Sequence, residues 1–142
     1  MDKQELLLIA LGAGGKHEHT PVQVQKLLFL IDKNVGARIG GAVFDFVPYD
    51  YGPFDASVYE ILRELEEGGY VSSCETSRGW KRHALTDKGV SEAERLTQGV
   101  DPVVIDYIKR VSEFVRKLSF SDLVSAIYKA YPEMKANSVF RG

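Results

Sequence analysis

The sequence has a single cysteine, Cys74, so an internal disulfide bond is excluded. A lone cysteine fits a reducing compartment, and we expect a small, partly buried side chain on a strand. No apolar run approaches the length of a membrane span, and the run near the start covers only residues 6–11. Acidic residues precede that run, which does not resemble a signal peptide. We therefore expect a cytoplasmic protein that does not associate with a membrane.

The sequence also lacks an excess of basic residues. Its 20 acidic and 18 basic side chains give a net charge of −2. A nucleic-acid-binding protein usually has a basic balance, so the composition disfavours that class without excluding a local basic face. The length of 142 residues is enough for one domain with a buried core.

Motifs of catalysis are absent from the sequence. We find no P-loop, no Gly-x-Gly-x-x-Gly, no HExxH and no Ser-His-Asp order. We expect a non-enzymatic protein with no cofactor. His17 and His19 lie in one loop and His83 lies elsewhere, so a metal would need a further ligand from a distant part of the chain. We predict no metal site.

Hydrophobic periodicity and capping residues predict six helices, at residues 3–13, 21–35, 55–67, 87–96, 102–118 and 120–131. The second helix has the strongest start, because Thr20 can cap it, Pro21 suits its first position and Gln23 completes a capping box. The middle of this helix is apolar nearly all round. We therefore expect it to lie at the centre of the core.

Strands are predicted in two places. Residues 42–52 alternate in hydropathy before Pro48 interrupts the pattern, and Tyr51-Gly52-Pro53 then predicts a turn that directs the third helix, capped at Asp55. Residues 70–76 and 80–86 predict a hairpin joined at residues 77–79. Residues 36–41 are expected to form a loop, and the tail after residue 132 has no clear pattern.

The order of these elements is helix, helix, strand, helix, hairpin and further helices. It predicts a mostly helical α+β fold, namely a winged helix-turn-helix with a β-hairpin wing and extra C-terminal helices. We expect a single domain over residues 1–142. Its core would cover about residues 3–98, and a helical extension would cover about residues 100–131.

Two motifs carry a resemblance to a known family, namely "VQKLLFLID" and "YDYGPFDASVYEILRELEEGGYV". Over roughly residues 20–140 the chain resembles the Panacea or SocA-like antitoxin family and its YwgA-like relatives. The matching positions are Gln25–Leu28, Tyr49–Pro53, Val58, Tyr59, Leu62 and Leu65. The resemblance implies a prokaryotic or phage protein, often linked to toxin–antitoxin loci, where some members neutralise a toxin by direct binding and one is a proteolytic adaptor. It implies no enzymatic activity.

The aromatic turn and the third helix form the first candidate surface for a protein partner, which could be a toxin. Its predicted residues are Tyr49, Tyr51, Gly52, Pro53, Phe54, Tyr59, Glu60 and Glu64. Two plainer interpretations remain open, a structural corner for the turn and a solvated outer face for the helix. Residues 51–70 carry five acids against one base, Arg63, and such a helix would repel a phosphate backbone.

A DNA-binding regulator that uses a basic wing is the alternative. The candidate residues are Arg78, Trp80, Lys81, Arg82 and Lys88. Charged hairpin tips are also common without any ligand. Residues 99–142 carry seven basic against five acidic side chains, and a homodimer through the C-terminal helices is a further open expectation.

Overall fold

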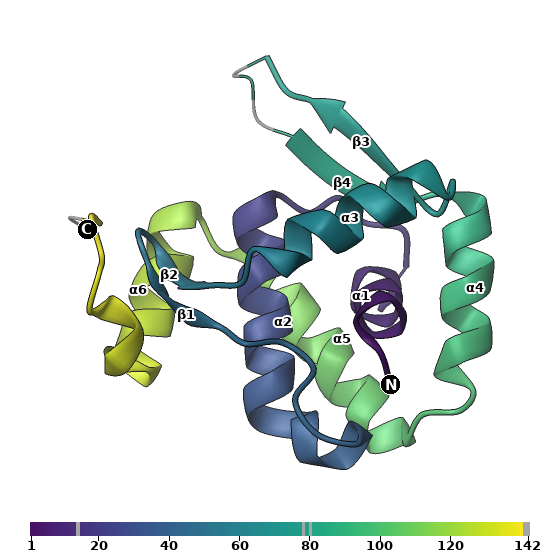
Figure 1. Cartoon of the computed structure of the whole chain (residues 1–142), viewed down its shortest axis with the longest axis horizontal. Coiled ribbons are helices and arrows are strands. Elements are labelled where there is room, and N and C mark those ends of the chain that lie inside the picture. Colours follow the sequence, from purple (N-terminus) through teal and green to yellow (C-terminus); the bar gives the residue numbers. More distant parts are fainter. Residues whose placement is uncertain (14, 78, 80, 141–142) are drawn as a thin grey trace.

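The computed structural model describes residues 1–13, 15–77, 79 and 81–140. Within these residues the protein is a mostly helical α+β structure with two short antiparallel hairpins (Figure 1). The elements are α1 (Lys3–Gly12), α2 (Pro21–Val35), the 3₁₀ helix η1 (Gly36–Ile39), β1 (Val47–Tyr49), β2 (Gly52–Phe54), α3 (Ser57–Glu67), β3 (Val71–Glu75), β4 (Lys81–Leu85), α4 (Asp87–Thr97), α5 (Pro102–Lys117), α6 (Phe120–Ala130) and the 3₁₀ helix η2 (Pro132–Lys135).

Helix starts follow local capping chemistry. The Thr20 hydroxyl accepts a hydrogen bond from the Gln23 backbone N–H, and the Gln23 side chain accepts one from the Thr20 N–H, so the predicted capping box is confirmed. The side chains of Thr86, Asp101 and Ser119 each accept a hydrogen bond from a backbone N–H in the first turn of α4, α5 and α6. These helices begin where the sequence predicts because each cap involves residues only two or three positions apart.

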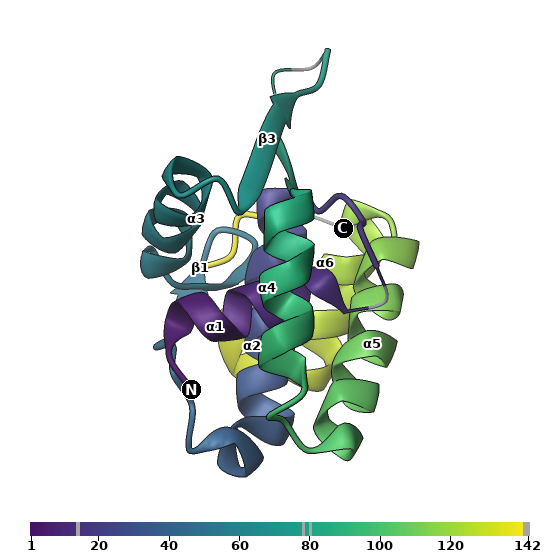
Figure 2. The ribbon, with the colours of Figure 1, turned by 90° about the vertical axis from the view of Figure 1, so that its right-hand side faces the viewer.

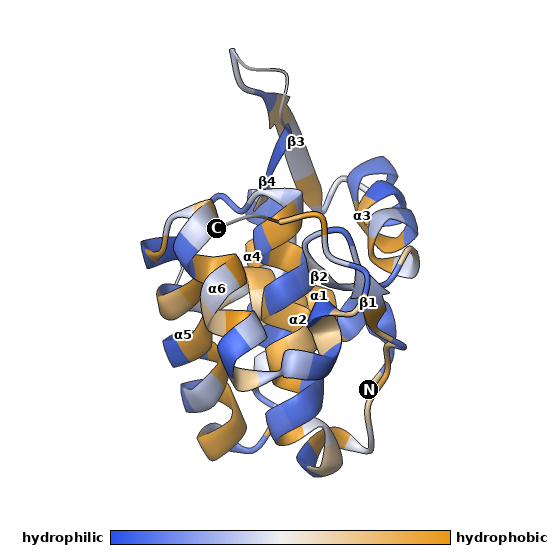
Figure 3. Cartoon of the chain, turned by 90° about the vertical axis from the view of Figure 1, so that its left-hand side faces the viewer, coloured by the Kyte–Doolittle hydropathy of each residue, from blue (hydrophilic) through white to orange (hydrophobic). Residues whose placement is uncertain are grey.

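Helix α2 lies at the centre of the molecule, as predicted, with α1, α3 and α5 around it (Figure 1). Leu27, Leu28 and Ile31 are fully buried there. Figure 3 shows hydrophobic residues concentrated along α2 and on the sides of α5 and α6 that face it. Val104 of α5 and Leu123 of α6 belong to the same hydrophobic cluster, so the C-terminal helices complete the core of the protein.

The predicted hairpin is confirmed as β3 and β4, which pair from Val71 opposite Leu85 to Glu75 opposite Lys81. It rises away from the helices (Figure 2). At its base, His19 and His83 exchange two backbone hydrogen bonds of 2.8 Å, which add a short segment to the edge of β4. Cys74 is exposed on β3, contrary to the expectation of partial burial, since this end of the hairpin extends beyond the body of the protein.

The strand predicted over residues 42–52 is wrong in its extent. The first strand covers only Val47–Tyr49, and Gly52 already belongs to a second strand. The strand does not extend back to residue 42, because the backbone N–H of Phe44 donates to the Asp32 carboxylate (2.9 Å) and that of Asp45 donates to Asp55 (2.7 Å). These N–H groups are therefore not available to a sheet. The Phe44 side chain is buried in the core instead.

The predicted Tyr-Gly-Pro turn is also misplaced. The chain reverses at Asp50 and Tyr51, and Gly52 and Pro53 belong to β2, where they face Tyr49 and Pro48 across a three-residue ribbon. Gly52 has φ +107°, which a side-chain-bearing residue adopts only with strain. The glycine thus sets the path of the second strand rather than the corner of the turn.

Two further boundaries differ from expectation. Helix α3 begins at Ser57, two residues after the predicted cap, although the Asp55 carboxylate still accepts a hydrogen bond from the Ser57 N–H at 2.8 Å. The predicted loop at residues 36–41 contains the 3₁₀ helix η1. No helix among the described residues combines the length and the apolar character that crossing a bilayer requires.

Candidate ligand groove and lysine pocket

A groove of about 830 Å³ separates α3 from the β3–β4 hairpin and the start of α6. It is lined by Thr20, Pro21, Val22, Tyr51, Tyr59, Leu62, Arg63, Glu66, Gly79, Lys81, His83 and Phe120. Ligand sites in proteins commonly have volumes of about 300–1,000 Å³ and a mainly apolar lining with a few polar groups. The groove fits both descriptions, and we call it the aromatic groove.

Aromatic side chains meet around this groove. Tyr49 stacks on Phe54 with ring centroids 4.7 Å apart, and Phe54 contacts Tyr59 at 5.6 Å. Tyr51 meets Phe120 edge-on at 5.2 Å. Tyr49, Phe54 and Tyr59 thus form one contact series, Tyr51 contacts Phe120, and the four predicted aromatic residues line one pocket beside the groove. Tyr49, Tyr51 and Tyr59 remain between 38% and 50% exposed.

Phe120 is a groove residue that the sequence reading missed. It is 47% exposed in the first turn of α6, 69 positions after Tyr51. The sequence pattern could have identified Phe120, because it is an apolar residue on the outer side of an amphipathic helix. No local pattern relates that position to the β1–β2 turn, because the contact depends on how α6 packs.

The two predicted acidic residues do not line the groove. Glu60 and Glu64 are exposed on α3, and the Glu64 carboxylate accepts a hydrogen bond of 2.7 Å from Gln4 on α1. The groove-facing side of α3 presents Arg63 and Glu66 instead. The structure thus separates the acidic pair from the aromatic residues with which the sequence grouped it.

Gly52 and Pro53 are buried, and Gly52 lies over α2. A Cβ atom added to Gly52 would lie 3.4 Å from the Tyr128 ring and 3.6 Å from Lys26 Nζ. Beside this contact is a pocket of about 170 Å³, lined by Val22, Gln25, Lys26, Tyr49, Asp50, Tyr51, Gly52, Pro53, Phe54 and Tyr59. We call it the Lys26 pocket. It adjoins the aromatic groove, since Val22, Tyr51 and Tyr59 line both.

Lys26 is a buried cation that the sequence reading did not single out. The residue is only 3% exposed, and its Nζ makes no hydrogen bond or ion pair with a described residue. Burial lowers the pKa of the Lys26 ammonium to about 8. The sequence pattern does indicate its burial, because Lys26 falls four positions after Val22 and four before Leu30, on an apolar stripe of the helix.

The predicted wing cations have different surroundings. Arg82 lies 3.6 Å from the Glu18 carboxylate, whereas Lys88 donates to the Gly68 carbonyl oxygen at 2.8 Å and lies over the Tyr70 ring. Lys81 is exposed and lines the aromatic groove. The predictions for Arg78 and Trp80 fall outside the described residues.

His19 and His83 are buried polar residues where the His19 segment pairs with β4. His19 is fully buried, with its Nε2 atom 3.5 Å from the Ser112 hydroxyl, and His83 Nδ1 lies 2.7 Å from the Ser73 hydroxyl. Burial, and then the nearby Arg116 charge, lower the pKa of His19 to about 4. Burial also lowers the pKa of His83. Among the described residues, no three His, Cys, Asp or Glu side chains are grouped to hold a metal ion.

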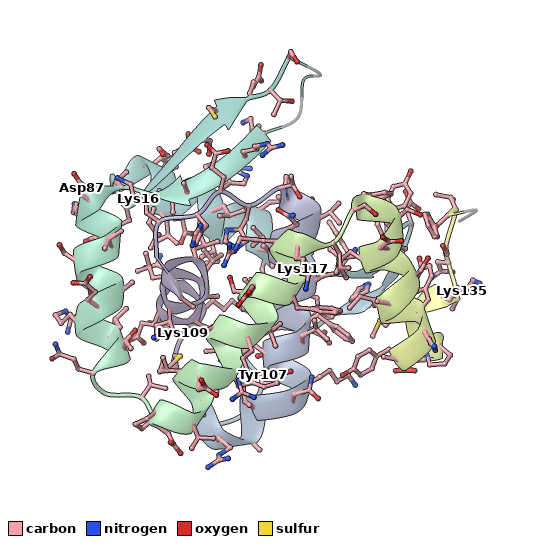
Figure 4. All side chains as sticks on the ribbon, turned by 180° about the vertical axis from the view of Figure 1, so that it is seen from behind. Lys16, Asp87, Tyr107, Lys109, Lys117 and Lys135 are labelled. Carbon is pink, nitrogen blue, oxygen red and sulfur yellow. The ribbon has the colours of Figure 1, made fainter. Side chains whose placement is uncertain are left out.

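The described basic side chains of the C-terminal helices line neither the aromatic groove nor the Lys26 pocket. Lys109 and Lys117 lie on the α5 side of the molecule that Figure 4 shows from behind. Lys16, labelled in the same view, forms an ion pair of 2.8 Å with Asp87 at the start of α4. Lys16, Lys109 and Lys117 therefore add no charge to the lining of the groove or of the pocket.

No protein-family model matches this sequence, and no curated protein matches it. The geometry of the aromatic groove and of the Lys26 pocket is therefore the basis for a functional conclusion. The groove combines segments from α2 to α6, whereas the pocket combines α2, the β1–β2 ribbon and α3, and Tyr51 and Tyr59 line both.

Proposed function

We propose that this protein is a non-enzymatic protein-interaction module, antitoxin-like or adaptor-like, that docks a segment of a protein partner in its aromatic groove. The observation that carries the proposal is the groove itself, about 830 Å³ in volume and bordered by Tyr51, Tyr59 and Phe120. Exposed aromatic residues at the edge of a concave site are typical of interface hot spots. A cytoplasmic protein of prokaryotic or phage origin is the corresponding setting.

A winged-helix arrangement is part of this proposal. Helices α2 and α3 precede the β3–β4 hairpin, α4 follows it, and the His19 segment pairs with β4. In that arrangement α3 has the place of a recognition helix and the hairpin is the wing. The aromatic groove then lies between recognition helix and wing, where a docked segment would contact both.

Membership of the Panacea or SocA-like family is likewise proposed, and contacts between its two motifs support it. Gln25 of the "QKLL" motif hydrogen-bonds the backbone of Asp55, which follows the "YGPF" motif. Lys26 of the first motif contacts Gly52 of the second. The two motifs therefore act as one structural unit that shapes the groove.

The charges around the groove favour a segment with negative charge among apolar residues. Arg63 and Lys81 border the groove and Lys26 lies at its adjoining pocket, and none of the three forms an ion pair with a described residue. Glu66 accepts a hydrogen bond from Ser73 at 3.1 Å. Complementary charge mainly contributes specificity and association rate, while the aromatic surface contributes affinity.

The surroundings of α3 and the wing favour a protein partner over DNA. Glu60, Glu64 and Glu67 are exposed on α3, where they would repel phosphate groups. Arg82 and Lys88 have partners within the protein, so they would have to exchange these contacts for phosphates. A DNA complex would have to overcome both effects.

Site-specific photocrosslinking in cells tests the proposal. A photoreactive phenylalanine analogue replaces Tyr51 in the groove, and in a matched control it replaces Phe114, which is 44% exposed on α5. We expect a protein to be crosslinked from the Tyr51 position only. With that protein purified, Tyr59→Ala should weaken binding about tenfold or more, as for an interface hot spot. Equal crosslinking from both positions, or no effect of Tyr59→Ala, would contradict the proposal.

A further inference from the structure

Lys26 has a feature that docking in the aromatic groove does not explain. A lysine side chain is rarely buried without a partner, because an unpaired charge is costly to remove from water. The Lys26 side chain is only 3% exposed, and no described residue accepts a hydrogen bond from its Nζ. Methionine or leucine would fill the same space without that cost. Without a bound partner, Lys26 therefore lowers the stability of the folded protein.

The pocket beside Lys26 has room for a counter-ion and supplies none. Asp50 lines it, yet no ion pair with Lys26 forms, and burial is the sole cause of the lowered pKa of Lys26. No neighbouring carboxylate offsets the positive charge there. The backbone carbonyl of Asp50 is occupied by the N–H of Val139 at 2.9 Å. The ammonium thus faces an apolar and aromatic pocket that lacks an anion.

We propose that the Lys26 pocket binds the carboxylate of an acidic side chain carried by the segment that docks in the aromatic groove. This inference rests on the proposed function, because it takes the groove as the place of docking. The pocket has about a fifth of the volume of the groove, as 170 Å³ compares with 830 Å³. One side chain suits the pocket, and the remainder of the segment suits the groove.

The energetics favour such a carboxylate over a neutral group. Pairing buried charges usually requires both to lose water, and this loss can cancel the attraction. The Lys26 side chain has already lost most of its contact with water on folding, so most of the remaining desolvation falls on the incoming carboxylate. The resulting ion pair would be shielded from solvent by Tyr49, Tyr51 and Tyr59, where attraction between charges is stronger than in water. An acidic residue should therefore be selected at one position of the segment.

The test uses the full-length protein and mixtures of short capped peptides. One mixture has Glu at the central position and Leu, Phe, Tyr or Ala elsewhere, and a second has Gln in place of Glu. A third has the central Gln and a free C-terminal carboxylate. A small acid, 4-phenylbutyrate, is added separately. Bound peptides are quantified by mass spectrometry, and the ¹³Cε NMR signal of Lys26 reports direct contact.

Two lysine variants make the test specific. Lys26→Met removes the ammonium at nearly constant volume, and Lys33→Met makes the same change at an exposed position of the same helix. We expect the Glu mixture to bind the wild-type protein and Lys33→Met about tenfold more tightly than the Gln mixture, as for a charge-assisted hydrogen bond. That preference should disappear in Lys26→Met, while binding of the Gln mixture should stay unchanged.

The outcomes separate this inference from the proposed function. Equal binding of the Glu and Gln mixtures in the groove would overturn the inference and leave the docking role intact. Preference for the free C-terminus, or a Lys26 signal that responds only to 4-phenylbutyrate, would overturn the choice of an acidic side chain. Absence of binding by every mixture would overturn the inference together with the docking role.

Discussion

The side-chain amide of Gln25 forms a two-way hydrogen-bond pair with the backbone of Asp55. Gln25 Nε2 donates to the Asp55 carbonyl oxygen at 3.0 Å, and the Asp55 N–H donates to Gln25 Oε1 at 3.0 Å. Gln25 is 2% exposed, so both bonds are shielded from water. The pair joins α2 to the segment that leads into α3 and so positions one wall of the aromatic groove.

Replacing Gln25 by alanine should therefore destabilise the protein by about 2 kcal/mol, because it leaves the Asp55 N–H without a partner and removes one of the two hydrogen bonds to the Asp55 carbonyl oxygen, which keeps the bond from the Val58 N–H. Urea unfolding measures this loss. Gln4→Ala is the matched control, since the exposed Gln4 amide bonds only the Glu64 side chain and its loss should cost about 0.5 kcal/mol or less. Equal effects of the two substitutions would contradict a structural role for Gln25.

Lys26→Met should raise the free energy of unfolding at neutral pH. The folded-state pKa of Lys26 is about 8, below its ordinary value of 10.5. Between these values the unfolded chain binds more protons, so the stability of the wild type should rise with pH across this window, by about 3 kcal/mol in full. The variant should be more stable than the wild type at pH 7 and should lack this rise.

Unfolding curves of wild type, Lys26→Met and Lys33→Met at pH 7, 8.5 and 10 measure this difference. The exposed control, Lys33→Met, should keep the rise with pH. A Lys26→Met protein that is less stable than the wild type at pH 7 would show that the ammonium contributes favourably to the fold, against this prediction.

Acid should destabilise the protein through His19. Its folded-state pKa is about 4, below the ordinary value of 6.5, so the unfolded chain binds more protons between these values. The contribution of His19 to stability is complete above about pH 6.5 and is lost as the pH falls toward 4, by about 2 kcal/mol at pH 5. His83 acts in the same direction, since burial lowers its pKa as well.

His19→Gln removes the titrating ring and should flatten the loss of stability between pH 7 and pH 5. Thermal unfolding at several pH values within this range compares the variant with the wild type. Part of the pH dependence should remain in the variant because of His83. An unchanged slope would exclude His19 as the main acid-sensitive group in this range.

Gly89→Ala should destabilise the protein by about 3 kcal/mol. A Cβ atom at Gly89 would lie 2.1 Å from the Tyr70 carbonyl oxygen, so α4 would have to move away from the base of the β3–β4 hairpin. Gly99→Ala is the control, because its nearest contact would be an ordinary 3.7 Å. Circular dichroism during thermal unfolding checks both, and similar melting temperatures would refute the prediction.

Interactions within a few residues account for what could be predicted from the sequence. The capping box of Thr20 and Gln23 and the apolar stripe of α2 involve neighbouring turns of one helix, and both are as expected. The β3–β4 hairpin is local as well. The strand predicted over residues 42–52 was too long because side chains from other segments bind its backbone. Asp32 and Asp55 accept hydrogen bonds from N–H groups that a longer strand would have used.

The amino-acid sequence by itself thus determined the existence of the helices, the caps of α2, α4, α5 and α6, the main hairpin and the aromatic character of residues 49–59. The tertiary structure alone decided that Phe120 meets Tyr51, that Glu64 turns toward Gln4, and that Lys26 is enclosed beneath Gly52. Helical periodicity places Lys26 on the apolar side of α2, but its loss of water depends on a hairpin that arrives from a later part of the chain. Burial is a property of the packed molecule, and the chemistry of the proposed site follows from it.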